Sequence, residues 1–206
     1  MKVLLINGSP NKAGCTFTAL NEVSKTLQAQ GIETSIYHIG NKPVRGCNAC
    51  WGCGDNKRCV FDNDPANKIA DLIRESDAVV IGSPVYYASI NGTLSALLDR
   101  VFFSAGSDFA HKPAAGIVSC RRGGASSAFD RLNKYFTISN MPVVSSQYWN
   151  SVHGMSPEEV QQDLEGLQIM RTLGLNMAWL LKNIEAGKSS IELPNREEWT
   201  PTNFIR

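Results

Sequence analysis

The sequence predicts an α/β protein with a doubly wound parallel sheet of five strands, and two observations support this prediction. Short apolar runs alternate with helical patterns through the first 150 residues, as buried parallel strands alternate with the crossover helices that cover both faces of their sheet. The length of 206 residues and the hydrophobic content of 43% suit one compact domain with a sizeable core.

Five segments have the pattern of strands. The first is apolar and ends directly before Gly8, and the second alternates between apolar and polar residues, as an outer strand does. The third and fourth are again apolar, which favours burial on both faces of a sheet. The predicted strands are Lys2–Asn7, Ile32–Ile39, Asp77–Gly82, Lys112–Ser119 and Met141–Tyr148.

The segments between and after these strands place apolar residues at helical spacing. In the first of them Phe17, Leu20, Val23 and Leu27 share one face, and Gly31 ends the pattern. The predicted helices are Thr16–Gln30, Pro65–Ser76, Leu94–Phe103, Ser126–Phe136 and Pro157–Glu185.

The organisation changes near the C-terminal end of the chain. Ser156 as a cap, Pro157 at the first helical position and two glutamates in the first turn predict the start of the last helix. The tail after this helix contains two prolines and Trp199 and is predicted to be an extended arm. We therefore expect one domain over residues 1–187, followed by an arm over residues 188–206.

Charge and hydropathy exclude several classes of partner. The formal net charge is +1, which gives no sign of a nucleic-acid-binding face. The apolar stretch at the N-terminus, Val3–Ile6, is too short for a signal peptide, and the longest apolar run is far shorter than a membrane span. We expect a cytoplasmic protein with no nucleic-acid or membrane partner.

The loop after the first predicted strand has the composition of an anion site. Residues 8–16 contain two glycines, hydroxyl side chains and an amide, directly before a predicted helix. Unpaired backbone N–H groups and the helix dipole favour an anion at such a place. The loop is neither a Walker loop nor a G-x-G-x-x-G turn, which favours a monophosphate over a triphosphate or a dinucleotide. The alternative is an ordinary turn before a capped helix.

Two further loops leave the same edge of the predicted sheet, where ligands of open parallel sheets bind. Residues 83–92 contain two adjacent tyrosines between Pro84 and Gly92, and such a segment can supply apolar walls for a flat ring. Residues 119–126 contain paired arginines and paired glycines, which can steady the negative charge of a reduced flavin. The alternatives are tyrosines that pack beneath their loop and a solvated basic turn.

These loops, together with a cysteine-rich segment, resemble the flavodoxin-like NAD(P)H-dependent FMN reductase family. The segments that match it are Ile6–Thr16, Gly46–Asp62, Gly82–Arg100 and Cys120–Gly124. The resemblance spans about the first 150 residues and implies a flavodoxin-like sheet with strand order 2-1-3-4-5 and FMN as the cofactor.

The resemblance also implies roles for individual residues. Those expected to hold the FMN phosphate are Ser9, Asn11, Cys15 and Thr16. Those expected to line the isoalloxazine ring are Pro84, Val85, Tyr86 and Tyr87. Those expected to meet its far edge are Gly123 and Gly124. The family often has a polar residue at the position of Cys15, so the role of this side chain stays open, although its backbone N–H can serve.

A long loop between the second strand and the second helix, residues 40–64, contains four of the six cysteines and is called the cysteine loop below. Cys47, Cys50, Cys53 and Cys59 can supply the four thiolates that one [4Fe–4S] cluster needs. Their spacing also resembles that of the iron–sulfur flavoproteins, a branch of the same family. A zinc site is less natural because one cysteine is shared between the two short spacings. A cysteine loop without any cluster is the other alternative.

The leading functional hypothesis is an FMN-dependent oxidoreductase that accepts electrons from NAD(P)H or a ferredoxin-like donor. Its acceptor would be a quinone, an azo or nitro compound, free flavin or oxygen. We assign no catalytic side chain, because the cofactor performs the chemistry in a flavin enzyme. The alternatives are a non-enzymatic electron carrier between protein partners, and a flavodoxin-like protein with structural zinc and no flavin.

The sequence further predicts a homodimer or homotetramer. The last predicted helix is apolar around most of its circumference, which indicates that it is covered on two sides. We expect the cysteine loop and the arm at or near an interface between subunits. The alternative is a monomer whose arm folds back on its own body.

Overall fold

The computed structural model describes residues 1–54, 56–195, 197–198 and 200–202. It contains a sheet of five parallel strands in the order β2-β1-β3-β5-β6. Numbered among themselves, these strands have the order 2-1-3-4-5, so the predicted topology is confirmed. Their bounds are Lys2–Asn7 for β1, Glu33–His38 for β2, Ala78–Tyr86 for β3, Ala114–Cys120 for β5 and Ser151–His153 for β6.

A sixth strand, β4 (Ser89–Ile90), was not predicted from the sequence. It pairs antiparallel with the end of β3, where Val85 is opposite Ile90 and Tyr86 is opposite Ser89. Strand β3 therefore extends past the predicted end at Gly82, and residues 85–90 form a hairpin rather than an irregular loop. This segment is called the β3–β4 hairpin below.

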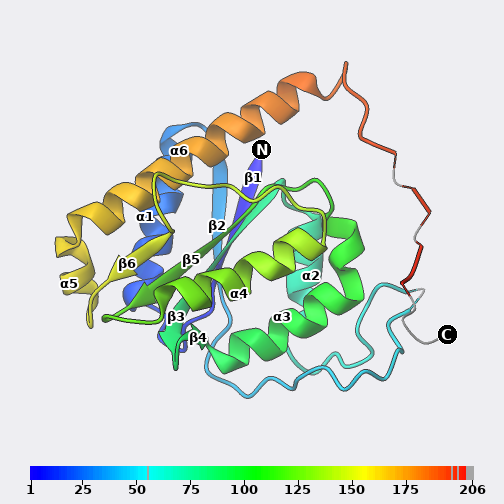
Figure 1. Ribbon diagram of the computed structural model, residues 1–206, viewed down its shortest axis with the longest axis horizontal. Coiled ribbons are helices and arrows are strands. Elements are labelled where there is room, and N and C mark those ends of the chain that lie inside the picture. Colours follow the sequence, from blue (N-terminus) through cyan, green and yellow to red (C-terminus); the bar gives the residue numbers. More distant parts are fainter. Residues whose placement is uncertain (55, 196, 199, 203–206) are drawn as a thin grey trace.

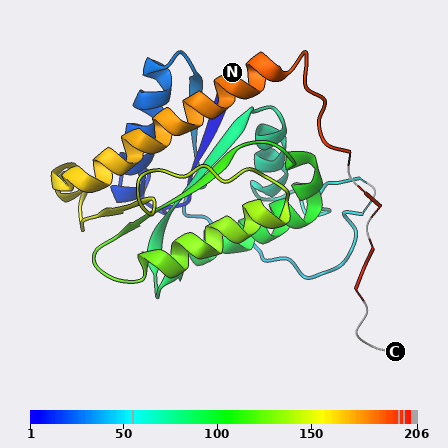
Figure 2. The same ribbon diagram turned by 45° about the horizontal axis from the view of Figure 1, so that its top comes forward.

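Helices cover both faces of the sheet (Figures 1 and 2). One face is packed against α1 (Cys15–Ala29) and α6 (Leu164–Gly187), and the other against α2 (Ala66–Arg74), α3 (Gly92–Ala105) and α4 (Ala125–Ile138). The remaining helices are short: α5 is Pro157–Gln162, and a 3-10 turn, η1, spans Gly106–Phe109.

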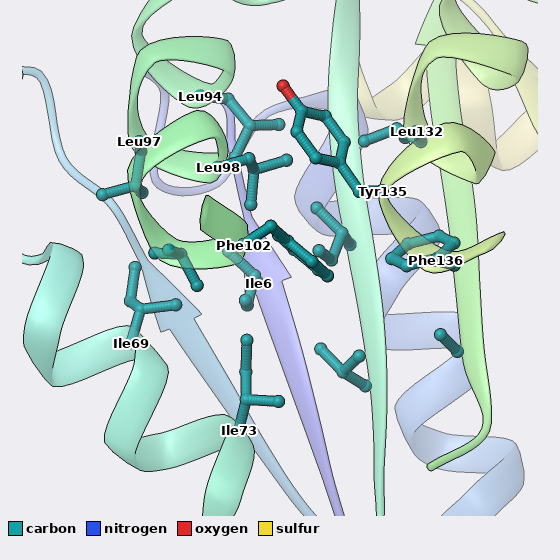
Figure 3. Close-up of a cluster of buried hydrophobic side chains, with 14 of the residues drawn as sticks. Ile6, Ile69, Ile73, Leu94, Leu97, Leu98, Phe102, Leu132, Tyr135 and Phe136 are labelled. Atoms are coloured by element: carbon teal, nitrogen blue, oxygen red, sulfur yellow. The ribbon is translucent and has the colours of Figure 1, made fainter. Parts of the chain in front are cut away.

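The apolar side chains of strand β1 point into two cores, one on each face of the sheet. Val3 and Leu5 point into the core beneath α1 and α6, whereas Leu4 and Ile6 point into the core beneath α2, α3 and α4. Figure 3 shows the second core, where Phe102 of α3 lies beside aromatic residues of α4; its ring centroid is 5.2 Å from that of Tyr135.

The last strand differs from the prediction. Met141–Tyr148 is not a strand; it forms only an isolated bridge between Val143 and Ala114. Beyond that bridge the polar residues leave the sheet and contact α6, where the Asn176 side chain donates a hydrogen bond to the Ser145 carbonyl over 2.9 Å. The edge strand β6 forms instead at Ser151–His153. The apolar Met-Pro-Val-Val run thus predicted a strand several residues too early.

The predicted helix Pro157–Glu185 is two helices. Ser156 caps α5 as expected, because its hydroxyl accepts from the Glu159 N–H. Asp163 then breaks the helix with a ψ of 77°. Its carboxylate accepts from the Gly166 N–H over 2.9 Å and so starts α6, and it also accepts from the His153 N–H over 2.7 Å. The break therefore ties the start of α6 to strand β6.

The described part of the arm lies outside the two cores. After a turn at residues 188–190, its described residues are exposed and extended, and the arm runs down the outer side of the molecule in Figure 1. Trp199 lies outside the described residues. None of the helices in the described part of the chain is both long and apolar enough to pass through a lipid bilayer.

Candidate functional site

The last residues of β3 and β5 and the loops that follow β1, β5 and β6 meet at the carboxyl edge of the sheet and line a pocket of about 190 Å³, called the edge pocket below. Seven of the residues predicted for the site line it: Ser9, Asn11, Cys15, Thr16, Pro84, Val85 and Tyr86. The pocket is also lined by Ser119, Cys120 and Arg121 of the predicted loop at residues 119–126, and the structure adds Gly154 and Met155, which the sequence analysis did not assign.

Buried amide side chains shape the first loop of the edge pocket. Asn7, at the end of β1, is fully buried; its Oδ1 accepts from the Ser9 N–H and its Nδ2 donates to the Lys12 carbonyl, each over 3.1 Å. Asn91 reaches the same loop from the start of α3 and donates to the Gly8 carbonyl over 3.0 Å. These amides satisfy the backbone groups at the base of the loop and fix its path.

The N-terminus of α1 faces the edge pocket with the features of an anion site. Among the described residues, no side chain caps this helix at Gly14, and its first turn contains no acidic residue. The dipole of α1 therefore favours a negative group at this end. The Thr16 hydroxyl shares a hydrogen bond of 2.8 Å with the buried Ser119 hydroxyl, in which either oxygen can be the donor, so Thr16 keeps capacity for a further hydrogen bond beside its backbone N–H.

The β3–β4 hairpin forms one wall of the edge pocket. Its turn residues, Tyr87 and Ala88, both have positive φ angles, of 48° and 58°, which is the backbone that a two-residue hairpin turn requires and that residues with a side chain rarely adopt. Tyr86 lines the pocket, whereas Tyr87 is fully exposed at the tip. Both tyrosines also line a more open hollow of about 550 Å³ beside the pocket.

Neither of the two predicted glycines is among the residues that line the edge pocket, and one of them, Gly124, supports the hairpin. Gly124 has a φ of 88°, and its position is so close to the turn that an added Cβ would lie 2.7 Å from the Ala88 Cα. The Ser127 hydroxyl, in the first turn of α4, donates to the Ala88 carbonyl. Gly123 has open space around it. Thus α4 and the turn before it hold the strained turn in place.

Two cysteines lie in the wall of the edge pocket. The pKa of the Cys15 thiol is raised by burial and further by Glu159 and Glu158, and the thiol donates a long hydrogen bond to the Gly154 carbonyl, at 3.7 Å. Burial also raises the pKa of Cys120. Both side chains therefore favour the neutral thiol, and Cys15 connects α1 to the loop after β6.

The cysteine loop forms a second, separate candidate site. Cys47, Cys50, Cys53 and Cys59 line one small cavity together with Arg100 and Phe103 of α3. The pKa of Cys53 is raised by burial and further by the three other thiols, because like charges near one another are disfavoured. Within the described part of the chain, however, no three His, Cys, Asp or Glu side chains have an arrangement ready to hold a metal ion. The predicted [4Fe–4S] cluster therefore stays a prediction.

Comparison with known proteins agrees with this geometry. The model of the family described as NADPH-dependent FMN reductase matches residues 1–155. An iron–sulfur flavoprotein of Methanocaldococcus jannaschii is 28% identical over 90% of this chain and 100% of its own length. Among solved structures, RosB with a bound riboflavin-phosphate intermediate has a TM-score of 0.70 at 15% identity, over 100% of this chain and 94% of its own.

A flavodoxin from the domain Archaea has a TM-score of 0.58 at 15% identity, over 88% of this chain and 99% of its own. These structural likenesses show the flavodoxin-like fold, as the sequence analysis predicted. The family model covers three quarters of the 206 residues and includes the β1, β3, β5 and β6 loops around the edge pocket. The chain therefore belongs to the NADPH-dependent FMN reductase family, whose cofactor is FMN.

Proposed function

We propose that this protein is an FMN-dependent oxidoreductase that takes electrons from NAD(P)H or a ferredoxin-like donor and passes them to a small acceptor such as a quinone, an azo or nitro compound, or a flavin. The observation that best supports this proposal is the edge pocket. At the carboxyl edge of a flavodoxin-like sheet, this pocket combines three features. They are the N-terminus of α1, which no described side chain caps, a preceding loop whose sequence favours a monophosphate, and an apolar wall formed by the hairpin.

The residues of the edge pocket divide into two groups by chemistry. The FMN phosphate would be held by the backbone N–H groups at the start of α1 and by Ser9 and Asn11 of the preceding loop. The isoalloxazine ring would lie against Pro84, Val85 and Tyr86, which offer an apolar surface. When bound, FMN supplies the hydride and electron chemistry. The chain binds and orients it, and Arg121 adds positive charge at the rim.

A ligand series tests the phosphate assignment. Flavin-free protein is titrated with FMN and with riboflavin, which lacks the phosphate, and binding is followed by flavin fluorescence. We expect FMN to bind at least about tenfold more tightly, because the loop and the α1 dipole act only on the phosphate. The exposed residue Asn11 provides a variant: Asn11→Asp should weaken FMN binding but not riboflavin binding. Equal affinities of wild-type protein for the two flavins would refute the assignment.

A turnover assay tests the reaction. Oxidation of NADPH and of NADH is followed without oxygen in the presence of FMN-loaded protein and a quinone, an azo compound or a nitro compound. Turnover with a nicotinamide and any of these acceptors supports the oxidoreductase. Tightly retained flavin with no oxidation of either nicotinamide would favour an electron carrier between protein partners instead.

A second candidate function rests on the cysteine loop: an iron–sulfur flavoprotein that relays electrons. Its support is the gathering of four cysteines around one cavity and the likeness, over its full length, to a protein named an iron–sulfur flavoprotein. Four thiols match the ligands that a [4Fe–4S] cluster needs. Iron and sulfide analysis of protein purified without oxygen tests it. Absent iron after reconstitution, or one zinc per chain, would exclude the cluster.

We also propose that the protein is at least a homodimer. One side of α6 is buried against the sheet, but Leu164, Leu175 and Trp179 on its other side are exposed. Such an apolar helix surface favours a second covering layer. Light scattering at micromolar concentration tests this, and a mass of one chain for active, flavin-bound protein would exclude the oligomer.

A further inference from the structure

We propose that Asn67 and Arg100, called the clamp below, are buried residues that hold Cys59 in place before any metal group is bound. The other three cysteines would then close around the fixed sulfur of Cys59 when the cysteine loop binds its metal group. This inference rests on the second candidate function for its ligand, an iron–sulfur cluster. The two clamp residues come from different helices, α2 and α3, and neither was singled out by the sequence analysis.

Asn67 holds the backbone of Cys59 at two points. Its Oδ1 accepts from the Cys59 N–H and its Nδ2 donates to the Cys59 carbonyl, both over 2.9 Å. The same Nδ2 also donates to Asp62 over 3.0 Å. Asn67 itself is 1% exposed, so the packing of α2 restricts its rotamer, and the pair of bonds sets the orientation of the Cys59 backbone.

Arg100 holds the side chain of Cys59 and both ends of the loop segment around it. Its Nε donates to the Cys59 Sγ over 3.3 Å, and its guanidinium also donates to the Phe61 carbonyl over 2.6 Å and to the Asp64 carboxylate. A longer bond, 3.5 Å, reaches the Arg45 carbonyl. The residue is 2% exposed. A buried arginine is costly unless its donors are satisfied, and here the acceptors all belong to the cysteine loop.

Among the described residues, the other three cysteines of the loop lack side-chain hydrogen bonds like those to Cys59. Cys47 and Cys50 are exposed, and Cys53 is half-buried like Cys59, so the difference between these two lies in their hydrogen bonds rather than in burial. Within the described part of the chain, no side chain donates a hydrogen bond to the Sγ atoms of these three cysteines. The contacts are therefore asymmetric: two buried residues bind the backbone and the sulfur of Cys59, whereas none of the side-chain hydrogen bonds in the described part of the chain reaches the other three thiols.

The contact between Arg100 and sulfur has a second consequence. A hydrogen bond to a ligating sulfur, and a positive charge beside it, favour the reduced form of an iron–sulfur group and so raise its reduction potential. Arg100 is thus a positioning residue with an electrostatic effect on the bound group, and this effect separates its role from simple packing of the loop.

Hydrogen exchange of the full-length, metal-free protein tests the clamp. Arg100→Lys keeps the charge but cannot satisfy four acceptors, and Asn67→Ala removes both bonds to the Cys59 backbone. We expect exchange of the hydrogen-bonded Cys59 amide to speed up at least about tenfold in each variant. Arg131→Lys is the matched control, because Arg131 is a half-exposed arginine that pairs with Asp99 away from the cysteine loop. Unchanged exchange in both clamp variants would overturn the inference.

Reconstitution with iron and sulfide tests the effect on the ligand. We expect Arg100→Lys and Asn67→Ala to lose at least half of the wild-type cluster occupancy, and the Arg100→Lys cluster to have a more negative reduction potential. Occupancy and potential equal to those of Arg131→Lys would refute the clamp. If Arg100→Lys fails to fold, Asn67→Asp, which keeps the acceptor for the Cys59 N–H, replaces it in the exchange and occupancy measurements. Wild-type protein without iron would refute the second candidate function, and hydrogen exchange would still decide the clamp.

Discussion

Adjacent glycines before α4 give a sharp test of how the β3–β4 hairpin is positioned. In Gly124→Ala the new Cβ would lie 2.7 Å from the Ala88 Cα and 3.2 Å from the Val85 Cγ1, at a φ of 88°. Alanine in this backbone region costs about 1–2 kcal/mol, and crowding a packed site costs about 1–3 kcal/mol more. Gly123→Ala meets nothing within 4 Å, so it should change stability by less than about 0.5 kcal/mol.

We therefore expect Gly124→Ala to lower the free energy of unfolding by about 2–5 kcal/mol in urea titrations. The hairpin is the easiest part to displace, because the clash lies at its turn, and it forms a wall of the edge pocket. FMN affinity, measured by fluorescence, should accordingly fall at least about tenfold, or about 1.4 kcal/mol, while Gly123→Ala binds like wild type. Equal FMN affinity of the two variants would refute the proposed role of the hairpin.

Three further predictions follow from single contacts. Asn7→Ala removes two hydrogen bonds to the loop after β1. It should lower the free energy of unfolding by about 2 kcal/mol and weaken FMN binding. Reduced stability with FMN binding as tight as in wild type would contradict the proposed role of Asn7 in shaping this loop. Burial alone would raise the pKa of Asp108, but hydrogen bonds from Lys57 and Arg74 lower it. The ionised Asp108 therefore contributes about 1 kcal/mol to the free energy of unfolding above about pH 4, and this contribution is lost as the pH falls further. In urea titrations at a series of pH values, Asp108→Asn should abolish this loss of stability at low pH. Burial chiefly, and a hydrogen bond to Asp99, raise the pKa of Tyr135 to about 12, so the stability that the protonated Tyr135 contributes declines as the pH rises above about 10. Burial also raises the pKa of Tyr37, so phenolate absorbance should show late titration from which Tyr135→Phe removes the component near pH 12.

The local parts of the fold were predictable because their causes lie in neighbouring residues. Strand β1 has the predicted bounds, Lys2–Asn7, since its apolar run and the following Gly-Ser-Pro turn are both local signals. The Met141–Tyr148 strand was wrong because an apolar run does not determine where a strand pairs, and here polar contacts with α6 draw the chain off the sheet. The helix break at Asp163 depends on a carboxylate that also binds the His153 N–H, a contact between separate elements.

For the candidate site, too, features set by neighbouring residues were predictable and those set by distant contacts were not. The predicted residues of the loop after β1 and of the end of β3 line one pocket, since the carboxyl ends of parallel strands meet at one edge, and their roles toward FMN stay predictions. Gly154 and Met155 enter the wall only through the position of β6, and no motif marks them. Arg100 was missed because an arginine in an amphipathic helix ordinarily lies at the solvent face. Its burial depends on acceptors that the cysteine loop brings from elsewhere in the chain.

Helix α3 links the two candidate sites physically. At its start, Asn91 caps the helix by accepting from the Thr93 N–H over 2.8 Å and also donates to the Gly8 carbonyl beneath the edge pocket. Nine residues later Arg100 holds the cysteine loop, which at 1.5 Å per residue is about 14 Å along the axis. The helix between these contacts packs in the core through Leu94, Leu97 and Leu98 (Figure 3). Both candidate sites therefore depend on the position of this one helix.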